Sequence, residues 1–200
     1  YEQRGNIPDV SALKNRINKG GLSYGYGFQA TFMQMLSAYS AFNNDGLIAQ
    51  PRLIENLELD GKIYKLNDNE IKTAISKETA AVMKEILIKV VNEGTGRGTK
   101  MQGLTIGGKT GTARIAKGGT YVEAYNSSFF GFANDESTSY TIGVFVREPK
   151  KGSFYAAQNA LPVFKKTVNI LVENGYLKPN LENIEKKITI KDEKLEEIKD

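Results

Sequence analysis

The residues best suited to chemistry stand together in one short run, Gly107-Gly-Lys-Thr-Gly-Thr-Ala113. Lys109 supplies an ammonium group, and Thr110 and Thr112 supply hydroxyls. Gly111 lets a ligand come close to the backbone. At the edge of a sheet, such a run fits an extended peptide that ends in a carboxylate. The run therefore predicts a strand that binds a peptide carboxylate.

The same stretch also matches a phosphate-binding loop. Gly103 to Thr110 reads G-x-x-x-x-G-K-T letter for letter. In a true loop of this kind, a buried strand precedes the motif and a helix follows it, with its amino end facing the phosphates. Here residues 99–102 are no buried strand, and residues 111–114 read as a continuing strand. A P-loop nucleotide-binding domain is therefore an alternative to the strand, and the pattern favours the strand.

Two further motifs carry less weight. Ser11-Ala-Leu-Lys14 is the only S-x-x-K in the chain, a spacing at which the amine could take the hydroxyl proton. It lies in a polar stretch, whereas a nucleophile needs a helix end packed in a core, so we interpret it as a coincidence. Gly25 to Ala30 matches G-x-G-x-x-A, but no strand precedes it, which predicts a glycine-rich turn that leads into a helix.

Composition excludes several kinds of site. The chain has 200 residues, with 27 Lys and Arg, 23 Asp and Glu, and neither Cys nor His. Disulfides, thiolate or imidazole metal sites and a Ser-His-Asp triad are excluded. Lys, Tyr or carboxylates would have to move protons in any reaction. A non-catalytic binding module remains an alternative, but the basic residues are scattered, so no nucleic-acid partner is expected.

Several landmarks follow one another along the chain: Ser23-Tyr-Gly-Tyr-Gly27 with Thr31 and Gln34, Gly94-Thr-Gly96, Gly108 to Arg114, Ser128 to Ala133, and Ala160 to Lys165. In this order they resemble the C-terminal half of the transpeptidase domain of class B penicillin-binding proteins. The resemblance covers nearly all of residues 15–178, and K-T-G belongs to the signature of penicillin-binding proteins and serine β-lactamases. The S-Y-G-Y-G form favours the septal, cell-division branch. Phe32 and Asn134 stand where prolines are expected in the family.

The resemblance implies a D,D-transpeptidase that cross-links peptidoglycan stem peptides through a serine acyl-enzyme and binds β-lactams. Lys109 would supply positive charge in the cleft. Thr110 and Thr112, on either side of Gly111, would hold the carboxylate of a D-Ala-D-Ala peptide or a β-lactam. The backbone N–H of Thr112 would form half of the oxyanion hole. The family needs no metal and no cofactor.

The resemblance also implies a setting for the parent protein. It would work on the extracytoplasmic, periplasmic face of the bacterial inner membrane, anchored by an N-terminal helix outside this chain. Other proteins of the division machinery would be its partners.

The family uses two motifs besides K-T-G: an S-x-x-K that carries the nucleophile, and an S-x-N. The chain contains no S-x-N, and only 108 residues precede Lys109. We therefore expect both motifs to lie before Tyr1 and the chain alone to be inactive. Segments that pack on the sheet in this family would then also be missing. We expect this to leave apolar surface exposed, through which the chain self-associates.

Capping residues and apolar periodicity predict three helices. Residues up to Gly27 read as irregular. A capping box of Thr31 and Gln34 begins a helix that ends at Gly46. Ser76 begins a second helix that stops at Gly94. Its apolar face is expected to comprise Val82, Met83, Ile86, Leu87 and Val90. A third helix is predicted over residues 156–174, where Pro162 would kink it or mark a later start.

Turn residues outline the strands. Asp60-Gly61 predicts a hairpin between strands at 52–59 and 62–66. Three further strands are predicted at 104–116, 125–133 and 140–147, separated by Gly118-Gly119 and by Asn134-Asp-Glu136. This order indicates an α+β fold, a partial transpeptidase fold in which helices cover antiparallel strands. Residues 1–180 would form the C-terminal portion of a transpeptidase domain, and residues 181–200 a charged, solvated tail.

Overall fold

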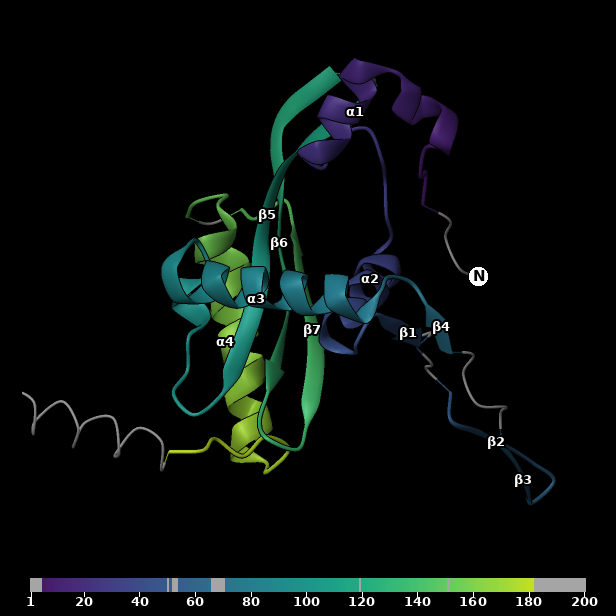
Figure 1. Cartoon of the computed structure of the whole chain (residues 1–200), viewed down its shortest axis with the longest axis vertical. Coiled ribbons are helices and arrows are strands. Elements are labelled where there is room, and N and C mark those ends of the chain that lie inside the picture. The colour runs from purple at the N-terminus through teal and green to yellow at the C-terminus, as the bar shows by residue number, and fades with distance from the viewer. Residues whose placement is uncertain are drawn as a thin grey trace, which may run out of the picture.

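A three-stranded antiparallel sheet forms the centre of the molecule (Figure 1). The computed structural model describes residues 5–49, 51, 54–65, 71–118, 120–150 and 152–181. The strands are β5 (Thr105–Lys117), β6 (Thr120–Asn134) and β7 (Ser139–Arg147), in the order β5-β6-β7. This is the predicted meander, although β6 begins earlier than expected. Residues 52–53, 66, 119 and 182–200, for which strand, turn or tail was predicted, lie outside the described residues.

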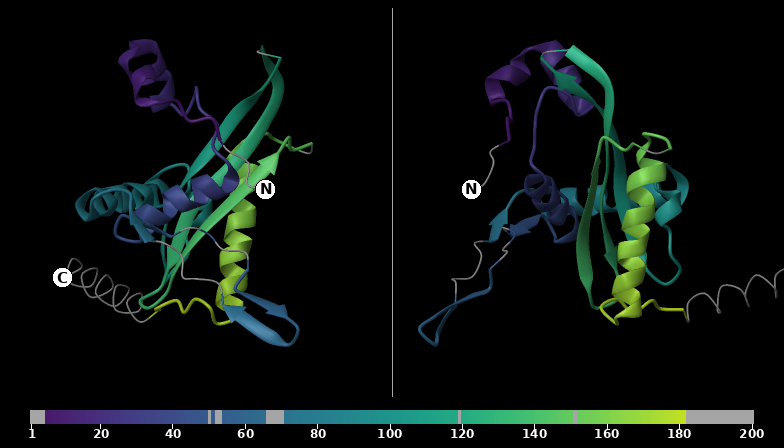
Figure 2. Two further views of the ribbon diagram at one scale, coloured as in Figure 1. Left: turned by 90° about the vertical axis from the view of Figure 1, so that its right-hand side faces the viewer. Right: turned by 180° about the vertical axis from the view of Figure 1, so that it is seen from behind.

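Helices cover both faces of this sheet. They are α2 (Phe32–Asn43), α3 (Lys77–Glu93) and α4 (Ala156–Glu173). Figure 2 shows α4 along one face of the sheet, with α2 and α3 on the opposite side. The predicted α+β class is therefore confirmed.

The alternation of side chains along β6 divides the core between the two faces. Phe129 is fully buried against Phe164 of α4, with ring centroids 4.6 Å apart. Phe130, the next residue, points to the other face and contacts Phe32 and Tyr39 of α2. Successive strand residues face opposite sides, so one apolar strand joins both helical layers.

The two residues that depart from the family's prolines both connect α2 to the sheet. Phe32 packs against Phe130 with ring centroids 5.4 Å apart. Asn134 and Asn43 exchange two side-chain amide hydrogen bonds, of 3.0 and 2.6 Å. Asn134 is buried, so this exchange satisfies polar atoms that would otherwise be costly to bury.

The N-terminal region is helical, so the prediction of irregular structure up to Gly27 is wrong. A 3₁₀ helix, η1 (Val10–Lys14), is followed by α1 (Arg16–Ser23). The side chain of Asp9 accepts backbone N–H groups at the start of η1, and Asn15 does so at the start of α1. Asp and Asn are strong N-caps, and in a polar, glycine-containing stretch these caps were the only signal.

The predicted starts of α2 and α3 are confirmed. The backbone N–H of Thr31 donates to Gln34 Oε1 over 2.9 Å, and the N–H of Gln34 donates to Thr31 Oγ1 over 3.1 Å. Ser76 Oγ accepts the N–H of Thr79 over 3.2 Å. Helix α3 ends at Glu93, directly before Gly94.

The apolar face predicted for α3 is partly wrong. Ala80, Leu87 and Val91 are its buried residues, whereas Val82 and Ile86 are 58% and 48% exposed. With 3.6 residues per turn, positions 80, 87 and 91 lie on one side of the helix. Val82 and Ile86 fall on the far side. The helix has more apolar residues than one face holds, so periodicity alone did not select the buried row.

Helix α4 begins at Ala156 and continues through Pro162, so the proline does not mark a later start. Four of its buried residues are spaced four apart, and the fifth, Leu161, lies beside them on the same face: Ala156, Ala160, Leu161, Phe164 and Val168. Among the residues that the structure describes, no helix combines the length and the apolar character needed to cross a membrane.

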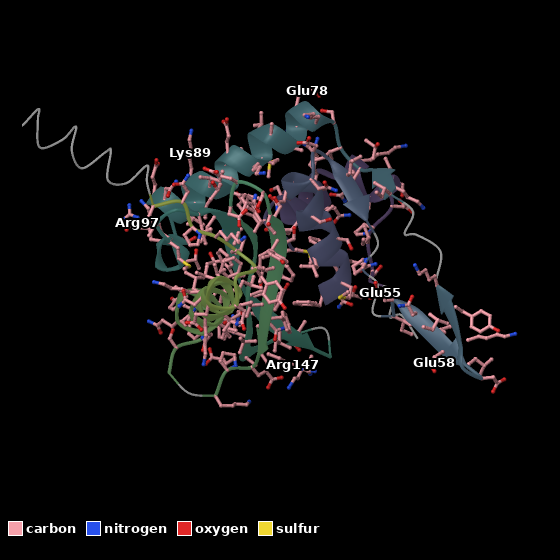
Figure 3. The ribbon with its side chains drawn as sticks, turned by 90° about the horizontal axis from the view of Figure 1, so that it is seen from below. Glu55, Glu58, Glu78, Lys89, Arg97 and Arg147 are labelled. Carbon is pink, nitrogen blue, oxygen red and sulfur yellow. The ribbon has the colours of Figure 1, made fainter. Side chains whose placement is uncertain are left out.

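Two small sheets lie between α2 and α3 in sequence. The hairpin of β2 (Asn56–Leu59) and β3 (Lys62–Lys65) confirms the prediction at Asp60-Gly61, whose φ angles of 51° and 73° suit a tight hairpin turn. Strands β1 (Leu47–Ala49) and β4 (Ile71–Thr73) pair with each other and were not predicted. The β2–β3 hairpin, which carries Glu58, projects from the body of the molecule (Figure 3).

Candidate functional site

The K-T-G run lies within β5, an outer strand of the central sheet. Gly108 pairs with Gly131 and Lys109 pairs with Phe130. A phosphate-binding loop requires a helix whose amino end follows the motif, but here the strand continues to Lys117. The alternative of a P-loop nucleotide site is therefore contradicted.

Two glycines let β6 pack tightly against the strand just before Lys109. A Cβ atom on Gly107 would collide with the ring of Phe132, and one on Gly108 would lie 2.5 Å from Cζ of Phe129. Both rings are fully buried. Aromatic residues on both faces of β6 thus fix the backbone from which Lys109 extends.

The ammonium group of Lys109 bends back toward the next residue. Its Nζ donates to the carbonyl oxygen of Thr110 over 2.9 Å and lies 3.4 Å from Thr110 Oγ1. Lys109 is exposed and Thr110 is half-buried. A cation and a hydroxyl therefore lie side by side at the same point of the strand.

Thr112 joins β5 to the start of α4. Its Oγ1 accepts the backbone N–H of Ala156 over 3.2 Å. Ser127, the register partner of Thr112 on β6, donates its hydroxyl proton to the carbonyl of Phe154. Two side chains at one level of the sheet therefore hold the segment that leads into α4 beside the K-T-G run.

Gly111 allows Ser128 to approach the strand. A Cβ atom on Gly111 would lie 2.5 Å from Ser128 Oγ. The four predicted site residues thus follow one another on one strand: Lys109, Thr110, Gly111 and Thr112. Their roles toward a ligand remain predictions.

The structure adds two features that sequence reasoning missed. Thr95, in the turn after α3, lies with its Oγ1 3.0 Å from Thr110 Oγ1. Tyr125 of β6 stacks on Phe154, with ring centroids 4.0 Å apart, and Arg114 of β5 lies 6.0 Å from the Tyr125 ring. The Gly94-Thr-Gly96 landmark was the only signal for Thr95, and nothing in the sequence pairs Tyr125 with Phe154.

The S-x-x-K match at Ser11 lies apart from any core. It forms part of η1, which has no buried residue. The hydroxyl of Ser11 donates to the carboxylate of Asp9 and not to the amine of Lys14. This environment supports the interpretation of the match as a coincidence.

Comparisons with known proteins agree on one family. Residues 2–169 match the family described as the penicillin-binding protein transpeptidase domain. Stage V sporulation protein D of Bacillus subtilis is 31% identical over 186 residues, which are 91% of this chain and 29% of that protein. Peptidoglycan D,D-transpeptidase FtsI of Buchnera aphidicola is 30% identical over 82% of this chain and 28% of its own length. The chain thus spans less than a third of these relatives.

Solved structures show the same similarity. Penicillin-binding protein 3 of Mycobacterium tuberculosis superposes with a TM-score of 0.77 at 26% identity, over 90% of this chain and 43% of that one. The same protein has been solved in complex with aztreonam and with ampicillin. The transpeptidase domain of penicillin-binding protein 3 from Burkholderia pseudomallei gives a TM-score of 0.71 at 28% identity, over 88% of this chain and 51% of its own.

Proposed function

Because the chain belongs to the family of penicillin-binding protein transpeptidase domains, we propose that it contributes the K-T-G strand of a peptidoglycan D,D-transpeptidase. One observation carries the proposal: Lys109, Thr110 and Thr112 succeed one another along an outer strand of a rigidly packed sheet. An extended peptide can add to such a strand by backbone pairing. The substrate would be a stem peptide ending in D-Ala-D-Ala, and β-lactams would bind in its place.

The donors on the strand suit a terminal carboxylate. Lys109 Nζ and Thr110 Oγ1 are 3.4 Å apart, so one carboxylate can reach both groups. Hydrogen bonds between an ammonium group and a carboxylate are about twice as strong as neutral ones. The similar protein of M. tuberculosis, solved with ampicillin and with aztreonam, supports an anionic ligand at this strand.

The backbone of Thr112 is suited to an oxyanion hole. In an antiparallel pair, the N–H and C=O of one residue point to the same side, and the direction repeats every second residue. The Thr110 carbonyl accepts a bond from Lys109, so we infer that it points toward the open edge. The N–H of Thr112 then points to that edge too, where it would stabilise an oxygen that becomes negative during acyl transfer.

We propose that the nucleophilic serine and the S-x-N serine belong to the part of the transpeptidase domain that this chain does not span. The serine would form an acyl-enzyme with the stem peptide, and Lys109 would lie beside the bound carboxylate. Similarity to FtsI supports a role in septal peptidoglycan synthesis. Division proteins would then be the partners, and the periplasmic face of the inner membrane the place of action.

Labelling with a fluorescent penicillin tests this function. The complete reading frame that contains this chain should form a covalent adduct, whereas the 200-residue chain alone should form none. In the complete protein, Lys109→Ala should slow acylation by about 10²–10³-fold, the usual cost of removing one preorganised electrostatic donor. Lys100→Ala, an exposed lysine before β5, is the matched control and should label like the wild type. A stable adduct on the isolated chain would contradict the proposal.

A further inference from the structure

We propose that Thr95 is a positioning residue, which orients the hydroxyl of Thr110 so that it donates to the carboxylate of the ligand. The inference rests on the proposed function. Thr95 lies between α3 and the short helix η2 (Arg97–Thr99), where Arg97 is labelled in Figure 3. Its Oγ1 is 3.0 Å from Thr110 Oγ1, across 15 residues of sequence.

The turn that carries Thr95 is held on both sides. The backbone N–H groups of Gly94 and Gly96 both donate to the carbonyl of Val90, over 3.1 and 3.0 Å. The carbonyl of Gly96 accepts the N–H and the hydroxyl of Thr99, over 2.9 and 2.8 Å. Thr99 is fully buried. Thr95 therefore extends from a fixed backbone, and its hydroxyl is in place before a ligand arrives.

The proton of Thr110 can point in only a few directions. A threonine hydroxyl has one proton to donate and two lone pairs that accept. The Lys109 ammonium group, 3.4 Å away, can only donate. If Thr95 also donates, both lone pairs of Thr110 are occupied, and its proton is left for a ligand. If Thr110 donates to Thr95 instead, that proton is lost to the ligand.

A carboxylate selects between these two arrangements. Ionised carboxylates only accept hydrogen bonds, so a carboxylate beside Thr110 favours the arrangement in which Thr95 donates. The Thr95 hydroxyl then strengthens carboxylate binding without touching the ligand. A ligand whose carboxylate is masked as an ester gains much less from this orientation, since it presents no charged acceptor.

The test compares benzylpenicillin with its methyl ester on the complete reading frame. Rapid-quench mass spectrometry of the acylated protein separates the dissociation constant of the first complex from the acylation rate constant. Thr95→Val should raise the dissociation constant of the acid about threefold to tenfold, the effect of one hydrogen bond. The dissociation constant of the ester should change much less, and Thr95→Ser should restore the binding of the acid. Thr105→Val, an exposed threonine at the start of β5, is the matched control.

Other results would contradict either the positioning role of Thr95 or the proposed function. Equal losses for acid and ester would show that Thr95 only supports the turn, which overturns the positioning role. Unchanged binding of the acid by Thr95→Val would overturn it as well. If Thr95→Val melts early, Thr95→Ala takes its place. It also removes the hydroxyl, and it should raise the dissociation constant of the acid relative to that of the ester. Wild-type protein that forms no adduct would contradict the proposed function, and the role of Thr95 with it.

Discussion

The hydroxyl of Thr112 accepts a hydrogen bond of 3.2 Å from the backbone N–H of Ala156. Ala156 is the first residue of α4 and is buried. The first N–H groups of a helix have no partner within it, and Thr112 provides one. The start of α4 and the strand with the K-T-G run are therefore joined directly by a hydrogen bond.

Thr112→Val should destabilise the chain, because valine keeps the shape of threonine but leaves the buried N–H of Ala156 without its acceptor. An unsatisfied buried donor costs about 1–3 kcal/mol. Urea unfolding followed by circular dichroism measures the change. Thr112→Ser keeps the hydroxyl and should stay close to wild type; equal losses for Val and Ser would argue against the hydrogen bond.

Gly108→Ala should also destabilise the chain, since its Cβ would lie 2.5 Å from Cζ of the buried Phe129. Overpacking of this kind costs about 1–3 kcal/mol. Gly20→Ala in α1, where a Cβ meets nothing within 4 Å, is the control. It should be neutral or stabilising because alanine favours helix. Thermal melts in which Gly20→Ala is the less stable variant would contradict the close packing of Gly108 against Phe129.

Phe129→Ala should cost about 3–5 kcal/mol of unfolding free energy, the range for a large aromatic side chain removed from a core. Phe129 is fully buried and packs edge-on against Phe164. Val163→Ala on the same helix as Phe164 removes a side chain that is 48% exposed, and should cost far less. Chemical denaturation of both variants gives the comparison, and similar costs would be inconsistent with the core.

Asp135 should make stability depend on pH in the acid range. The backbone N–H groups of Lys178 and Ser137, with that of Thr138, donate to its carboxylate and lower its pKa from 3.8 to about 2. A lowered pKa stabilises the folded chain above pH 3.8, and this contribution is lost as the pH falls through 2. Melting temperatures of wild type and Asp135→Asn should therefore converge between pH 5 and pH 2. Parallel curves would rule out this role.

The isolated chain should self-associate through its exposed N-terminal apolar residues. Val10 and Ile17 are 79% and 83% exposed, on η1 and α1. Large exposed apolar side chains promote association, because contact with a second copy removes them from water. Analytical ultracentrifugation should show oligomers that dissociate in the double variant Val10→Glu, Ile17→Glu. The control is the double variant Leu57→Glu, Ile63→Glu in the β2–β3 hairpin, whose two side chains are also exposed; it should leave the oligomers intact. A monomeric wild-type chain would contradict the expectation.

Sequence alone predicted those elements whose signals are local. The capping box of Thr31 and Gln34, the Ser76 cap and the Asp60-Gly61 turn each fix a backbone conformation within four residues. The three long strands follow from alternation between turns. These signals sufficed for the α+β class and for placing K-T-G on a strand.

Features that depend on distant contacts could not be predicted. The three-residue pairing of β1 with β4 joins segments separated by a hairpin. The bond between Thr95 and Thr110 and the one between Thr112 and Ala156 depend on how α3 and α4 pack on the sheet. Nothing in the sequence indicates that Thr95 would contact Thr110, or Thr112 the start of α4. The exposure of Val82 has the same origin, since packing selects which apolar row of α3 is buried.

The order of the strands also bears on how the chain acquires its structure. β5, β6 and β7 succeed one another in sequence and α4 follows them, so each of these contacts closes a short loop. The Asn43–Asn134 pair closes one of 91 residues. Closing a longer loop costs more chain entropy, and distant contacts form later. When the chain folds, therefore, the sheet and the helix that follows it are expected to form first and to serve as the template on which α2 docks.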